Sequence, residues 1–262
     1  MIRPLRGGLV IGRITLLEAV RSRVLVVSLM FAVAMIAVAV AVAAVSIGER
    51  ARLIIDVGLA SSSALGSAIA IALAVISFSR ELERHTAYPV LARPPARWEF
   101  VLGKFAGVLA TMVVVVTLMV LCTALAVVAY GEPVPAAVWP SLLLACLEAS
   151  VVTSVALLFS CYTGPVLAAT FSTGAIIAGN FVGELAELAQ RMRGRGDALT
   201  AAALDAARMV LPNVQLLSLR TQAANNLPVE PAFVGWAVVY AVAYTAAALL
   251  LGMVIFERRR AV

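Results

Sequence analysis

The chain has 262 residues, of which 63% are apolar and only 13% charged, with a net charge of +6 and a mean hydropathy of +1.04. A soluble domain is about half apolar and a quarter charged. These values exclude a water-soluble globular domain and a disordered chain. The three cysteines lie in apolar runs, which excludes a disulfide scaffold. The composition therefore predicts an integral membrane protein built from helices.

The apolar segments are long and continuous, whereas a membrane β-barrel would alternate apolar and polar residues over about ten positions. A helix needs about 20 residues to cross the hydrocarbon. The stretch Pro133–Gly183 contains one charged residue, Glu148, and a turn sequence at Tyr162–Pro165, so it is divided into two spans. We predict six transmembrane helices at residues 24–46, 57–79, 105–129, 138–160, 165–183 and 232–256.

The N-terminal residues 1–23 are basic and precede the first apolar run. That run is longer than the apolar part of a signal peptide, which has about 7–15 residues, so we predict an uncleaved first span. Arg3, Arg6, Arg13 and Arg21 fall on one side of a helix drawn at 100° per residue. This pattern favours a helix along the membrane surface, and the alternative is a basic leader that only sets the topology.

Basic residues indicate the orientation, because cytoplasmic loops carry an excess of Lys and Arg. Placing both termini in the cytoplasm puts 13 of the 20 basic residues inside and 7 outside. Five of those outside lie in one long segment, where the rule is weakest. We therefore predict cytoplasmic termini. The positive charge is explained by topology and anionic lipid, and we expect no nucleic-acid partner.

Residues 184–231 are predicted to form an extracytoplasmic helical segment before the last span. Leu185, Leu188 and Met192 recur at helical spacing, and Asp197 is placed to cap a second helix that ends before Pro212. We expect these helices to pack on the outer mouth of the bundle. The pattern leaves open whether they act as a lid, a partner surface or a simple connection.

Residues 80–104 form a charged loop between the second and third spans. A connection between adjacent spans needs only a few residues, and Pro94-Pro95 divides this longer loop. Arg80 and Arg84 lie one helical turn apart, which predicts a short helix near residues 79–87. Such a helix is suited to contact another protein, and the alternative is a solvated loop.

The loop contains Glu-Arg-x-Thr, then Leu, Pro-x-x-Arg and Gly-Lys, and a Leu-Pro-Asn sequence follows later in the chain. These residues are Glu83, Arg84, Thr86, Leu91, Pro94, Arg97, Gly103, Lys104 and Leu211-Pro212-Asn213. In this pattern and in its six-span layout the chain resembles the permease subunits of type-2 ATP-binding-cassette transporters. It is most similar to the NosY-type branch, which is linked to maturation of multi-copper enzymes.

The resemblance implies a single permease domain over residues 1–262 in the plasma membrane of a prokaryote. It implies that the 80–104 loop is a cytoplasmic coupling helix, on which a separate ATPase docks and drives transport, with ATP and Mg on that partner. It implies a dimer with a second or homologous permease. The contact residues would be Arg80, Glu81, Glu83, Arg84, His85, Thr86 and Arg97, and the structural motif residues Pro94, Gly103 and Lys104.

The sequence shows no catalytic, metal or cofactor pattern of its own. Gly103-Lys104 lacks the glycine that a phosphate-binding loop requires, and the single histidine, His85, cannot supply two axial ligands to a haem. We expect an exporter subunit that is not an enzyme. The alternatives are an ATPase-independent secondary carrier, which would need several intramembrane charges and broken helices, and a non-transporting anchor or assembly subunit.

Glu148 is the one ionisable residue well inside a predicted span, where a charge costs about 2.5–3.5 kcal/mol on insertion scales. It either lines a substrate path or forms a hydrogen bond with Ser or Thr on a neighbouring helix. Candidate partners are Thr153, Thr170 and Thr173. Ser61, Ser62 and Ser63 with Gly66 favour a close-packing helix face over a ligand contact.

Overall fold

A computed structural model of the chain describes residues 24–45, 50–83 and 97–258, and these residues form helices with no strand among them. The predicted surface helix at residues 1–23 and most of the predicted coupling loop lie outside the described residues. The helices, in chain order, are α2 (Val24–Val45), α3 (Arg50–Glu83), α4 (Arg97–Ala129), α5 (Val138–Ser160), α6 (Pro165–Gly179), α7 (Val182–Gly194), α8 (Ala198–Val210), the 3-10 turn η2 (Gln215–Leu217), α9 (Arg220–Ala224) and α10 (Pro231–Arg258).

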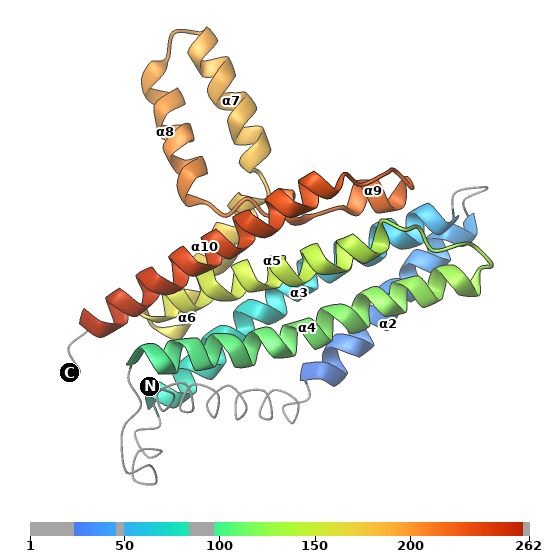
Figure 1. The fold of residues 1–262 in the computed structure, drawn as a ribbon, viewed down its shortest axis with the longest axis horizontal. Coiled ribbons are helices and arrows are strands. Elements are labelled where there is room, and N and C mark those ends of the chain that lie inside the picture. Colours follow the sequence, from blue (N-terminus) through green and yellow to red (C-terminus); the bar gives the residue numbers. More distant parts are fainter. Residues whose placement is uncertain (1–23, 46–49, 84–96, 259–262) are drawn as a thin grey trace.

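Four of these helices are long and apolar enough to cross a bilayer: α3, α4, α5 and α10. They run alongside one another in one elongated bundle (Figure 1). The bent pair α6 and α7 adds a fifth candidate if the two are counted as one span. The chain is therefore an all-helical, multi-pass membrane protein. Helix α2, which covers the predicted first span, has no charged residue and packs against α3 and α4.

The helices around the predicted coupling loop extend beyond the predicted spans. Helix α3 begins at Arg50, before the predicted span at 57–79, and runs without a break to Glu83, so it includes the first residues of the short helix predicted near 79–87. We expected a helix to start near Ala96 and to run into the span at 105–129, and α4 begins at Arg97. At 1.5 Å per residue, the 34 residues of α3 reach about 51 Å. Both helices are therefore longer than the hydrocarbon, which is about 30 Å thick.

The straight helix expected over residues 165–183 does not form. Helix α6 ends at Gly179 after 15 residues, and the chain turns by 63° into α7. At the turn, the Asn180 side chain donates to the Ile176 carbonyl (2.9 Å), and Gly179 packs against the Pro212 backbone. Fifteen residues reach only about 22 Å, so α6 alone is too short to span.

Helices α7 and α8 form an antiparallel hairpin that stands away from the bundle (Figure 1). The predicted cap is confirmed, because Asp197 Oδ1 accepts a bond from the Thr200 backbone N–H (3.1 Å). The Thr200 hydroxyl, together with this N–H, lowers the pKa of Asp197. Asp205 on α8 pairs with Arg193 on α7. The expected packing on the bundle is wrong: Leu199 and Met209 are each 85% exposed, and α7 and α8 pack chiefly against each other.

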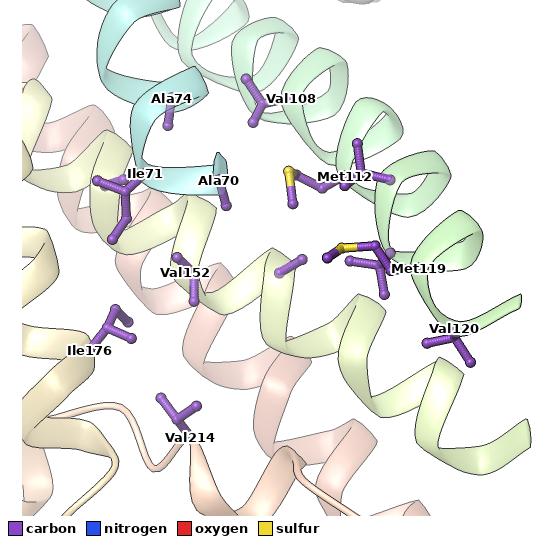
Figure 2. Close-up of a cluster of buried hydrophobic side chains, with 14 of the residues drawn as sticks. Ala70, Ile71, Ala74, Val108, Met112, Met119, Val120, Val152, Ile176 and Val214 are labelled. Atoms are coloured by element: carbon purple, nitrogen blue, oxygen red, sulfur yellow. The ribbon is translucent and has the colours of Figure 1, made fainter. Parts of the chain in front are cut away.

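The core lies between α3, α4 and α5, where small and branched side chains interdigitate. Figure 2 shows Ala70 and Ala74 of α3 near Val108 and Met112 of α4, with Val152 of α5 beside them. Without a solvent-driven hydrophobic effect in lipid, close van der Waals contact holds such helices together. The small residues of α3 allow that approach.

Gly58 of α3 lies against Thr123 of α4. A Cβ atom there would lie 2.3 Å from Thr123 Cγ2 and 2.9 Å from Thr123 Cβ, whereas at Gly66 the nearest atom, on Val116, is 3.6 Å away. We expect Gly58→Ala to lower the free energy of unfolding by about 1–3 kcal/mol through overpacking. Gly66→Ala should raise it by up to about 1 kcal/mol through helix propensity.

This expectation is measured by unfolding the purified variants in mixed detergent micelles. Adding Gly58→Ala to a Thr123→Gly background should not lower the free energy of unfolding further. The three close atoms, Cγ2, Oγ1 and Cβ of Thr123, are then absent. Equal effects of Gly58→Ala and Gly66→Ala would contradict the close contact.

Candidate functional site

Glu148 lies in α5, only 4% exposed, and hydrogen-bonds across to α3. Its Oε1 atom accepts from Ser63 Oγ at 2.6 Å and from Ser67 Oγ at 3.2 Å. The two serines are four residues apart, so they share one face of α3. The predicted kind of partner, a hydroxyl on a neighbouring helix, is confirmed. The named residues were wrong, because Ser63 and Ser67 take the place of the threonines.

The three adjacent serines, Ser61 to Ser63, make different contacts. Ser61 and Ser62 donate to the Gly58 and Leu59 carbonyls of their own helix and are buried in packing contacts. Only Ser63 reaches another helix. Helical geometry separates the three directions, since neighbouring residues in a helix point about 100° apart. The i, i+4 spacing of Ser63 and Ser67 in the sequence was the pattern that could have identified them as the partners of Glu148.

Thr153, one of the threonines expected to partner Glu148, is fully buried, and its Oγ1 has no hydrogen-bond partner among the described residues. An unsatisfied buried hydroxyl costs about 1–3 kcal/mol. We expect Thr153→Val, which keeps the shape, to raise the free energy of unfolding by about 1 kcal/mol.

The matched control for that substitution is Thr111→Val in α4. Thr111 is also buried, but its Oγ1 donates to the Gly107 carbonyl at 3.0 Å. The control should therefore lower the free energy of unfolding by about 0.5–1 kcal/mol. Detergent unfolding of both variants measures the difference, and a loss of stability in Thr153→Val would contradict the orphan hydroxyl.

Ser63 and Ser67 also line a groove of about 800 Å³ beside α5. One wall is α3, the second is α6, and the third is the segment from Val214 to Thr221. Leu59, Ile71 and Ile176 give the groove apolar surface, so it combines hydroxyl groups with an aliphatic lining. Such a mixture of apolar walls and a few placed polar groups is typical of small-molecule sites.

Arg220 of α9 closes one end of the groove and pairs with Asp56 of α3. The guanidinium makes two bonds, Nε to Oδ1 at 2.5 Å and Nη2 to Oδ2 at 2.6 Å. Donating these bonds to the Asp56 carboxylate raises the pKa of Arg220, which keeps the guanidinium charged. Both side chains are partly exposed, so the pair contributes at most about 1 kcal/mol. Its main effect is to hold the third wall against α3.

The sequence offered no signal for this pair, because the two residues lie 164 positions apart. The same holds for three phenylalanines at the end of the bundle where α3 finishes and α4 starts. The Phe78 ring lies 5.5 Å from that of Phe100 and 5.6 Å from that of Phe256, centroid to centroid. This aromatic cluster joins α3, α4 and α10.

The residues predicted to dock an ATPase lie next to the aromatic cluster or outside the described residues. Arg80, Glu81 and Glu83 belong to the last turn of α3, and Arg97 is the first residue of α4. Lys104 is only 2% exposed, with Nζ 5.9 Å from the Phe100 ring centroid, and Gly103 is buried beside it. The predicted sites outside the described residues are Arg84, His85, Thr86 and Pro94.

The described residues thus contain two features: the groove lined by Ser63 and Ser67, and the aromatic cluster where α3 finishes and α4 starts. No group of three or more His, Cys, Asp or Glu side chains suited to a metal ion occurs among residues 24–45, 50–83 and 97–258. No curated protein matches the chain. A family model described as "protein of unknown function (DUF2705)" matches residues 59–260. Because that match covers more than half of the chain, the protein belongs to the DUF2705 family.

Proposed function

We propose that this protein is the membrane-spanning permease subunit of a type-2 ATP-binding-cassette transporter, an exporter driven by a separate ATPase. The observation that carries the proposal is the charged motif between α3 and α4. Glu83 ends α3, and Arg97 begins α4, so the motif residues occupy the connection between two helices that both exceed the bilayer thickness.

The aromatic cluster supports a mechanical role for this connection. Phe78 and Phe100 lie close to the two ends of the loop, and Phe256 ties both to the last helix. A force applied to the loop would therefore move three helices together. Such rigid-body movement of packed elements is how a lever switches a helix bundle between two states.

The proposal includes the finer topology. Helix α2 is the first span, α6 with α7 serves as the fifth, and both termini are cytoplasmic, in the plasma membrane of a prokaryote. Two copies, or this chain with a homologous one, form the pathway together with two ATPase subunits. The α7–α8 hairpin then lies on the outer side.

The orientation is tested by labelling single cysteines in a cysteine-free background. An impermeant maleimide added to intact cells should label Glu187→Cys on the exposed surface of α7 and leave Glu83→Cys unlabelled until the membrane is opened. Labelling of Glu83→Cys from outside would overturn the proposed topology.

Docking is tested by co-purification with the ATPase encoded beside this gene. Charge reversal at Glu81, Glu83 and Arg84 should abolish co-purification and transporter-dependent ATP hydrolysis. The control reverses Glu187 and Arg191, an exposed i, i+4 pair on α7, and should leave both intact. An unaltered complex after the triple reversal would overturn the coupling role.

Two observations favour a second candidate, the secondary carrier. The broken pair α6 and α7 and the buried carboxylate of Glu148 are features of carriers that work without ATP. Transport by the purified chain in liposomes without any ATPase would establish that function in place of the first.

A further inference from the structure

We propose that the groove between α3, α6 and the Val214–Thr221 segment binds an amphiphile with an ammonium head group. The inference concerns this chain alone and does not depend on the ATPase. It goes beyond transport because it assigns a ligand class to a site.

The polar floor of the groove presents hydrogen-bond acceptors. Each serine hydroxyl has one proton, and both Ser63 and Ser67 direct theirs to Glu148 Oε1. Both serines line the groove, and each hydroxyl oxygen keeps a lone pair that can accept a further hydrogen bond. Asn180 likewise spends a side-chain N–H on the Ile176 carbonyl and keeps its amide oxygen as an acceptor. A ligand that donates hydrogen bonds therefore suits this floor.

The charge around the groove points the same way. Arg220 is the one cationic side chain in the lining, and it is matched by Asp56. Glu148 lies behind the serines, and Glu184 accepts from the Gln215 side chain at the rim (3.3 Å). No described residue donates to Glu148 Oε2. A buried carboxylate with so few donors is stabilised by a nearby cation.

The space available suits an aliphatic chain. Ala60, Ala64 and Ala68 lie on the groove side of α3, and their small side chains leave the volume open. Ile71, Ile176 and Ile177 supply the apolar contact. The site thus pairs a short polar floor with an aliphatic wall, which is the pattern of an amphiphile.

The test is binding of a dansyl-labelled alkylamine to the full chain in neutral nanodiscs, with a dansyl alkanol and a dansyl fatty acid of equal length as comparisons. We expect the amine to bind at least tenfold more tightly than either. Glu148→Gln should remove that preference while leaving the alkanol affinity unchanged, because the glutamine oxygen still accepts from both serines. Glu187→Gln on the exposed hairpin should change nothing.

A second variant distinguishes a loss of binding in the groove from a misfolded Glu148→Gln protein. Ala64→Leu fills the groove without touching Glu148 and should weaken all three probes together. Equal affinities of the three probes, or an amine preference that survives Glu148→Gln, would overturn the proposal. Ethanolamine phospholipid in the nanodisc distinguishes the source: displacement identifies a lipid-borne amine as the ligand, and its absence identifies a free amphiphilic amine.

Discussion

Phe78→Ala is expected to lower the free energy of unfolding by about 3–5 kcal/mol, the range for a large aromatic removed from a packed core. Phe78 is 1% exposed, and its ring is the centre of the aromatic cluster, tilted by 58° to Phe100 and by 68° to Phe256. Tilted ring pairs of this kind contribute about 0.5–1.5 kcal/mol beyond their buried area. The truncation removes two of them and leaves a cavity where three helices meet.

The control is Phe31→Ala on α2, whose side chain is 48% exposed. It should cost well under half as much, because a partly exposed ring leaves no enclosed cavity. Both variants are measured by circular dichroism during unfolding in mixed micelles. A Phe78→Ala protein no less stable than Phe31→Ala would show that the aromatic cluster does not hold the helix ends together.

Gly179→Ala is the second large effect, and we expect a loss of about 3 kcal/mol, the upper end for overpacking. A Cβ atom at Gly179 would lie 2.3 Å from the Pro212 carbonyl oxygen and 3.3 Å from Val214 Cγ2. The first of these is a backbone atom, which cannot rotate away as a side chain can. The end of α6 and the third wall of the groove must therefore move apart.

Gly174→Ala provides the matched control within the same helix, because nothing lies within 4 Å of a Cβ atom there. Its free energy of unfolding should rise by up to about 1 kcal/mol through helix propensity. Unfolding measurements on both variants give their free energies of unfolding. The alkylamine assay tests the groove, and Gly179→Ala should lower the affinity for the probe. Equal stability of the two variants would contradict the contact between α6 and Pro212.

Some of the architecture follows from local pattern alone. Charge-free runs long enough to cross a bilayer predict helices that satisfy their own backbone, and the runs near residues 105–129, 138–160 and 232–256 lie within α4, α5 and α10. The cap at Asp197 was predictable from sequence because it is a local interaction: the side chain bonds to Thr200, three residues ahead. These features depend only on neighbours in the chain.

The ends and bends of helices were less accessible. Helix α3 includes Arg50–Asp56, which lies outside the predicted span, and it continues through Arg80–Glu83 into the region of the predicted short helix. A helix satisfies its backbone hydrogen bonds internally, so it can extend beyond the hydrocarbon. At the bend, Gly179 lies against the backbone of Pro212, a residue distant in sequence. Periodicity therefore predicted the helices of the hairpin but not the direction in which they leave the bundle.

The candidate site shows the same division. The sequence marks Glu148 as the single carboxylate deep in an apolar run, since a charge in hydrocarbon needs a compensating partner. Which partner it meets depends on how α5 rotates and slides against α3, and packing alone settles that. Ser63, Ser67 and the Asp56–Arg220 pair were therefore found only once the helices were assembled. Local composition determines that helices form in a bilayer, and contacts between distant segments determine what those helices enclose.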